Sequence, residues 1–254
     1  MSSDTVSGDT VQASERTLAI VEALGDGEKR TLTELAADLD LPRSTLHGYL
    51  SSMVNAEYLV KEDGAYRLGL RFLDHGIAVQ RANLLYEAAG PILEQVADET
   101  RESVWLVVEE YGQAVCLRKA KGDLAIQPYK TLGGRLHLHS IAAGKAILAH
   151  LPESRVHEII DHHGLPAFTD ATITDRDRLF DGLERIAETG VAFNDGESLE
   201  RFRAVASPVC LDGEVLGSLV VSGPKNRLRG DRFTEEIPDT VTGAANALEL
   251  EVKC

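Results

Sequence analysis

The stretch LPRSTLHGYL, residues 41–50, decides the fold of the N-terminal part of this chain. Pro42 suits the first turn of a helix, where the backbone N–H that proline lacks is not needed. Apolar side chains then recur at helical spacing and predict an inward face made of Leu46, Tyr49, Leu50 and Met53. The stretch therefore predicts a short amphipathic helix.

Another short helix is expected before this one. Thr31 and Glu34 stand at the spacing of a capping box. One apolar face of this helix is formed by Leu32, Leu35, Ala36 and Leu39. Asp40 then takes the tight turn, because aspartate is among the few residues that tolerate left-handed backbone. With an earlier helix from Ser14, its expected N-cap, the pattern is typical of a helix-turn-helix.

The outward face of residues 41–56 carries no acid, although the chain as a whole is strongly acidic. It has 41 Asp and Glu against 26 Lys and Arg, a formal net charge of −15. A local neutral-to-positive helix face is what the major groove of DNA accepts. Residues 58–61 and 65–68 flank a turn and predict a two-stranded hairpin, the wing. We expect DNA contacts from Arg43, Ser44, Thr45, His47, Tyr49, Tyr66 and Arg67.

These segments resemble a known family. LPRSTLH at 41–47, followed by YRLG at 66–69, is similar to the N-terminal half of the IclR family of transcription regulators. LHSIAAGKAILA at 138–149 and VVSGP at 220–224 resemble later family segments in the same order, so the resemblance spans about residues 11–250. Gly48 departs from it, because the family commonly has arginine there. The operator sequence is therefore expected to differ from those of better-known members.

The resemblance implies an α+β protein that pairs a winged helix-turn-helix with a GAF-like effector-binding domain. It also implies a homodimer or dimer of dimers that binds palindromic operators in double-stranded DNA. We expect a disordered leader at 1–10, the DNA-binding domain at 11–72, a linker helix at 73–85 and the effector-binding domain at 86–254. An apolar seam along the linker is expected to join two copies through Leu70, Leu73, Ile77 and Leu84.

Strand patterns in the second half predict an antiparallel sheet with flanking helices. Residues 104–108 and 114–117 read as one hairpin, and 205–211 and 214–221 read as another across Asp212-Gly213. Thr174 with Asp177 predicts the start of a helix that runs to Glu188.

Small residues at 140–144 predict a pocket, because the free N–H groups of a helix start could hold a carboxylate or another anion. Close packing of the helix on the sheet is the alternative. The resemblance favours a pocket, since it implies small organic acids held by the backbone of Ala142 and Ala143 and by side chains at four later positions. At three of those four positions this chain departs from the family's commonly polar pattern: Asn194 replaces an acid, Ala204 a thiol and Val220 a hydroxyl. The identity of the effector is therefore not carried over from the family. The expected site is Ser140, Ala142, Ala143, Gly144, Asn194, Ala204, Val220 and Ser222.

Other classes of function have less support in the sequence. The chain lacks a run of about 18 apolar residues and a secretion signal, so we expect no membrane span and a cytoplasmic location. Three distant cysteines without a C-x-x-C spacing argue against disulfides and a cysteine zinc site. AGKA at 143–146 lacks the glycine and hydroxyl of a phosphate loop, and no G-x-S-x-G motif occurs.

His137 and His139 could bind zinc from one strand face, but no H-E-x-x-H motif supports them. We therefore expect no metal, no cofactor and no catalytic residue. Two alternatives stay open: a GAF-like enzyme that acts on a small acid, and a regulator that works through protein contacts alone.

The charge balance suggests the surroundings of the protein. Acids are in excess and only eight of the 26 basic residues are lysine, which is typical of a salt-adapted protein. In molar salt the Debye length is about 3 Å, so an acidic body repels DNA little beyond contact. An ordinary acidic cytosolic protein is the alternative.

Overall fold

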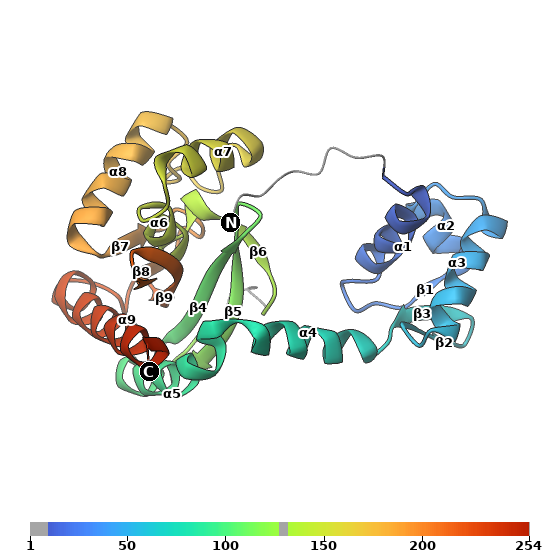
Figure 1. Cartoon of the computed structure of the whole chain (residues 1–254), viewed down its shortest axis with the longest axis horizontal. Helices are drawn as coiled ribbons and strands as arrows, with labels where there is room; N and C mark the ends of the chain where they lie inside the picture. The colour runs from blue at the N-terminus through green and yellow to red at the C-terminus, as the bar shows by residue number, and fades with distance from the viewer. Residues whose placement is uncertain (1–9, 127–131, 254) are drawn as a thin grey trace. The chain divides into compact units, whose positions relative to one another are not determined.

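The computed structural model describes residues 10–126 and 132–253, and the chain divides into two units, Met1–Arg81 and Ala82–Cys254 (Figure 1). The expected leader at 1–10 lies outside the described residues except for Thr10.

The N-terminal unit is a winged helix-turn-helix. Its elements are α1 (Gln12–Ala23), β1 (Arg30–Thr31), α2 (Leu32–Asp38), α3 (Arg43–Asn55), β2 (Leu59–Glu62) and β3 (Ala65–Leu68). The three strands form an antiparallel sheet in the order β1-β3-β2, so the predicted hairpin is confirmed and the short β1 is added to it. Its core is formed by Ile20, Leu24, Leu35, Leu46, Leu50, Met53, Leu59 and Tyr66.

Side chains at the helix ends explain where these helices begin. The capping box is confirmed: Glu34 N–H donates to Thr31 Oγ1 at 3.3 Å, and Thr31 N–H donates to the Glu34 carboxylate at 2.7 Å. Asp40 has the expected left-handed backbone, with φ of 50°. The prediction for Ser14 is wrong, because α1 begins at Gln12 and its N-cap, Val11, makes no side-chain cap.

The expected linker helix of 73–85 runs over Arg71–Ala82 as α4. Asn83 then accepts a hydrogen bond from Leu85 N–H at 3.0 Å and starts α5 (Leu84–Thr100). The break arises because an Asn side chain that satisfies a free N–H favours a new helix start. Leu84, expected in the linker seam, therefore belongs to α5, and α4 has no buried residue.

The C-terminal unit contains a six-stranded antiparallel sheet in the order β6-β5-β4-β9-β8-β7. The strands are β4 (Ser103–Glu110), β5 (Gln113–Lys121), β6 (Arg135–His137), β7 (Ala192–Asp195), β8 (Phe202–Leu211) and β9 (Glu214–Pro224). Both predicted hairpins are confirmed, and with them the α+β fold class.

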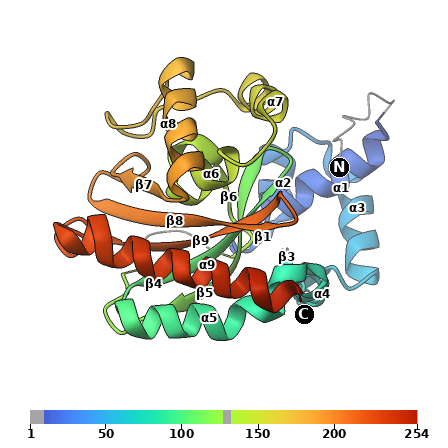
Figure 2. The ribbon, with the colours of Figure 1, turned by 60° about the vertical axis from the view of Figure 1, so that its left-hand side comes forward.

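Helices cover both faces of this sheet (Figure 2). On one face lie α5 and α9 (Ile237–Lys253), which follows a helical turn at Arg232–Glu236. On the other lie a 3-10 turn (Leu138–Ser140), α6 (Ala142–Leu148), α7 (Glu153–His163) and α8 (Arg176–Thr189). The predicted cap Thr174 is wrong: Asp175 accepts the hydrogen bond from Arg178 N–H, because its carboxylate lies one residue nearer the first turn.

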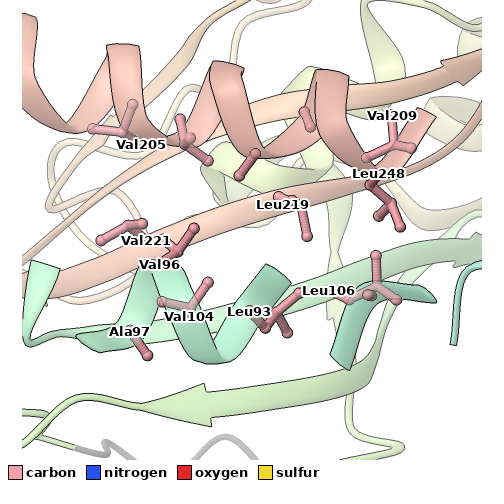
Figure 3. Packing of buried hydrophobic residues seen from close by; sticks show 14 of the residues in the cluster. Leu93, Val96, Ala97, Val104, Leu106, Val205, Val209, Leu219, Val221 and Leu248 are labelled. Atoms are coloured by element: carbon pink, nitrogen blue, oxygen red, sulfur yellow. The ribbon is translucent and has the colours of Figure 1, made fainter. Parts of the chain in front are cut away.

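Side chains alternate along the central strands, so successive residues pack against the helices on opposite faces of the sheet. On β4, Val104 and Leu106 pack under α5 and α9, as Figure 3 shows, whereas Trp105 and Val107 face α6. On β9, Val220 likewise faces α6. The α6 face of the sheet therefore receives the residues expected in the effector site.

No helix among the described residues is long and apolar enough to cross a bilayer.

Candidate DNA-binding surface and effector site

A cavity of about 30 Å³ lies between the sheet and α6. Its wall is made of Trp105, Val107, Cys116, Leu136, Ile141, Ala142, Ala143, Asn194, Ser198, Ala204, Val220 and Ser222. Six of the eight residues expected in the effector site are among them. One water molecule needs about 10–15 Å³, so the cavity admits solvent-sized molecules as it stands.

A second hollow of about 30 Å³ adjoins the first and shares five lining residues with it: Trp105, Asn194, Ser198, Ala204 and Ser222. It adds Arg203, whose guanidinium is held by Asp195 through bonds of 2.9 and 2.8 Å. Arg203 in turn holds the pKa of the Asp195 carboxyl well below its usual range. The first cavity is lined by apolar and neutral polar side chains, so it offers shape and hydrogen-bonding groups but no charged side chain.

Ser140 and Gly144, also expected in the site, do not line either hollow. A Cβ on Gly144 would fall 2.2 Å from the Leu138 carbonyl oxygen, so α6 packs closely on the preceding turn. The close-packing alternative thus describes Gly144, while Ala142 and Ala143 border the cavity. Ser140 contributes its carbonyl oxygen, which accepts a hydrogen bond from Asn194 Nδ2 at 2.7 Å.

The strongest feature of the expected DNA surface is the outward face of α3. Arg43, Ser44 and His47 are exposed, whereas Thr45 and Tyr49 are half-buried. No ion pair or hydrogen bond to the Arg43 side chain occurs within the described part of the chain. A free guanidinium at a helix start can approach a base or a phosphate.

Gly48 lies on the same face of α3, and a Cβ built there meets no atom within 4 Å. Packing therefore does not require glycine at this position. The departure from the family pattern leaves an open patch in the middle of the recognition helix.

The wing contributes less than expected. Tyr66 is 3% exposed and packs in the core of the N-terminal unit, so its ring is not available to DNA, and the expectation for this residue is corrected. Tyr66 is the buried residue of β3, and its side chain points inward to pack against apolar side chains of the helices. Arg67 is half-buried and donates to Glu62 at 2.7 Å; with Lys29 it holds the pKa of Glu62 at about 2.

Trp105 and Ser198 line the cavity but were not expected from the sequence. Because side chains alternate along a strand, the sequence places Trp105 on the same face of the sheet as Val107. This alternation is the signal that could have identified Trp105, once the face covered by α6 was known. Ser198 follows β7 in a loop, and nothing in the sequence pattern marks it.

The histidines do not gather into a metal site within residues 10–126 and 132–253. His139 Nε2 lies 3.1 Å from the carbonyl oxygen of Pro166, and the rings of His137 and His139 are 5.7 Å apart. Burial lowers the pKa of both histidines, and His163 adds to the effect on His137.

Two family models match this chain. One described as the IclR helix-turn-helix domain matches residues 13–63. One described as the C-terminal part of the bacterial transcriptional regulator IclR matches residues 77–250.

Curated relatives cover nearly the whole chain. The probable HTH-type transcriptional regulator ArcR of Halobacterium salinarum is 30% identical over 239 residues, which is 92% of this chain and 91% of the relative. The HTH-type transcriptional repressor AllR of Escherichia coli is 30% identical over 247 residues, 94% of this chain and 91% of the relative. These names do not favour the enzymatic alternative.

Solved structures share the fold. A putative transcriptional regulator from Rhodococcus sp. RHA1 has a TM-score of 0.85 at 24% identity, over 96% of this chain and 99% of that one. An IclR homolog from Microbacterium hydrocarbonoxydans, complexed with 4-hydroxybenzoate, has a TM-score of 0.83 at 25% identity, over 95% and 99%. The chain belongs to the IclR family of DNA-binding transcriptional regulators.

Proposed function

We propose that this regulator changes its affinity for a palindromic operator when a small organic acid binds in the cavity between α6 and the sheet. The observation that carries the proposal is the convergence of Ala142, Ala143, Asn194, Ala204, Val220 and Ser222 on one cavity wall. The 4-hydroxybenzoate in the Microbacterium structure supports a small carboxylate as the ligand class.

The wall fits a ligand with one apolar body and few polar atoms. Trp105 and Val107 offer apolar contact, and Ser198, Ser222 and Asn194 offer hydrogen bonds. The first-turn N–H groups of a helix have no partner within it, so those at Ala142 and Ala143 suit a carboxylate. This mode of binding uses neutral donors in place of a cation.

Trp105 provides the test, because it is the single tryptophan of the chain and lines the cavity. Titration with 4-hydroxybenzoate and a panel of other small monocarboxylates should change its fluorescence for at least one acid, and that acid should also change operator affinity. Acids that change operator affinity while Trp105 does not respond would place the effector site elsewhere.

We propose that DNA binding runs through Arg43, Ser44, Thr45, His47 and Tyr49 of α3, with Arg67 near the phosphate backbone. The exposed and unpaired Arg43 supports this assignment. Loss of a bidentate base contact costs about 1–3 kcal/mol, so Arg43→Ala should weaken operator binding by about 5- to 150-fold. Arg16→Ala, at a half-buried position of α1, serves as a control that also removes one arginine. Equal losses in the two variants would refute a specific role for Arg43.

The proposed regulator is a homodimer or a dimer of dimers, because one recognition helix reads too few bases to define a genomic site. Leu73 and Ile77 are exposed on α4, and we propose them as part of the contact between copies. Two recognition helices would then lie about 34 Å apart or a multiple of it. Light scattering of Leu73→Glu/Ile77→Glu should show a smaller particle than the parent.

A further inference from the structure

A buried ion pair joins two residues that follow or precede cavity-lining residues in the chain: Lys145 comes two residues after Ala143, and Glu197 directly precedes Ser198. Lys145 of α6 and Glu197, which follows β7, are 5% and 8% exposed. Lys145 Nζ donates to both carboxylate oxygens of Glu197, at 2.6 and 2.7 Å. Burying two charges is costly, so such a pair is weak evidence for stability and invites another explanation.

The pair anchors one short segment of backbone, residues 194–198. Thr172 Oγ1 donates to the carbonyl oxygen of Glu197 at 2.6 Å, and Thr169 Oγ1 donates to that of Gly196 at 2.7 Å. Residues 194 and 198, at the two ends of this segment, line the cavity. The segment is therefore held on one side by the ion pair and two threonines and faces the cavity on the other.

The orientation of the Asn194 amide depends on this anchor. Glu197 N–H donates to Asn194 Oδ1 at 3.2 Å, while Asn194 Nδ2 donates to the Ser140 carbonyl oxygen at 2.7 Å. Both ends of the amide are thus committed, which leaves it one orientation. If Glu197 moved, the bond to Oδ1 would be lost and the amide could turn.

Helix α6 contributes both to the cavity wall and to the ion pair. Ala142 and Ala143 border the cavity, and Lys145, two residues later on α6, holds Glu197. Burial raises the pKa of Glu197 and lowers that of Lys145, so each charge depends on its partner. A closed set of bonds thus joins α6 to residues 194–198.

Trp105 is 4% exposed and lines both hollows together with Asn194 and Ser198, the two ends of this segment. We propose that Lys145 and Glu197 are positioning residues for effector recognition: they hold residues 194–198 against α6, so that Asn194 presents a fixed amide to the cavity and Trp105 stays covered. The part that concerns the effector rests on the proposed function of this cavity. The part that concerns Trp105 does not, and it can be tested without an effector.

The test measures acrylamide quenching of Trp105, the only tryptophan, at a temperature well below unfolding. Lys145→Met and Glu197→Gln should each give a several-fold rise in the quenching constant. Leu248→Ala, a core truncation on the opposite face of the sheet, is the control for general loss of stability. It should lower the unfolding temperature and leave the quenching constant near that of the parent.

The double variant Lys145→Met/Glu197→Leu separates positioning from stability. Replacing both charges with apolar groups removes the unpaired charge, so the unfolding temperature should recover. Trp105 should still be quenched more strongly than in the parent, because the two hydrogen bonds from Lys145 Nζ to the Glu197 carboxylate are absent. Parent-like quenching in the single variants, or full shielding of Trp105 in the double variant, would overturn the proposal.

A second readout addresses effector recognition itself. The acid that shifts Trp105 fluorescence in the parent should bind the double variant about tenfold more weakly, the factor that 1.4 kcal/mol represents. Lys145→Arg, which keeps a cation, should retain more affinity than Lys145→Met. If no acid binds the parent, the proposed function fails while the quenching results still decide the positioning role.

Discussion

Replacing Glu62 with glutamine should strengthen DNA binding by the wing. The Glu62 carboxylate binds both Arg67, at 2.7 Å, and Lys29, at 2.5 Å. These two cations hold the pKa of Glu62 at about 2, so the carboxylate is ionised at every pH at which DNA binding is measured. Glu62→Gln removes this negative charge and releases both cations for phosphate groups.

The size of the effect follows from counterion release. Each phosphate contact adds about −0.9 to the slope of log K against log salt concentration. Two new contacts would steepen the slope by about 1.8, so lowering salt from about 200 to 50 mM should favour the variant over the parent by an extra factor of about 12. Fluorescence anisotropy of a labelled operator at several KCl concentrations measures this slope.

Asp63→Asn is the matched control, because Asp63 is the exposed neighbour in the same turn and Asn tolerates its left-handed backbone. The control removes one negative charge without releasing a cation. Equal slopes for Glu62→Gln and Asp63→Asn would refute the reasoning, since a general loss of acidity would then explain the gain.

Four further predictions concern other parts of the chain. Ala143→Trp should fill the cavity, leaving operator binding intact and abolishing the response to the effector; a normal response in a gel-shift assay would move the site elsewhere. Gly48→Ala should raise the free energy of unfolding by about 0.5–1 kcal/mol in urea titrations, because a mid-helix glycine costs that much and the added Cβ meets nothing. Burial lowers the pKa of His137 and His139 below 6.5, so the unfolded chain binds more protons and stability should fall as pH drops below that value; His139→Gln should flatten this dependence in unfolding curves. The acid excess predicts a higher unfolding midpoint in molar KCl than in dilute buffer, and equal midpoints would remove the salt-adaptation hypothesis.

Local signals in the sequence were enough to predict the fold of the N-terminal unit and both large hairpins of the C-terminal unit. The capping box of Thr31 and Glu34 and the Asp212-Gly213 turn are short-range features, in which a few neighbouring residues satisfy one another. Where two neighbours could serve equally, as Thr174 and Asp175 could, the pattern did not decide and the prediction was wrong.

The rest depends on contacts between residues far apart in the chain. Tyr66 was assigned to the DNA surface because it lies in the predicted wing, and only the packing of the helices shows that its ring is buried. Lys145 and Glu197 are separated by 52 residues and share no motif, so nothing in the sequence pairs them. The cavity likewise takes its wall from all six strands of the sheet, from α6 and from the loop after β7, which only the folded domain brings together.

Helix α4 has a consequence for how the regulator responds to dilution. It spans 12 residues and buries none of them, and helices of about 12–15 residues are marginal in water without packing partners. In the proposed dimer the second copy would supply that packing, so the order of α4 would depend on protein concentration. Dilution below the dissociation constant of that dimer would leave α4 without a packing partner and would weaken the coupling between effector binding and operator binding. The cellular concentration of the protein would then determine how strongly the effector changes operator affinity, as well as how much of the operator is bound.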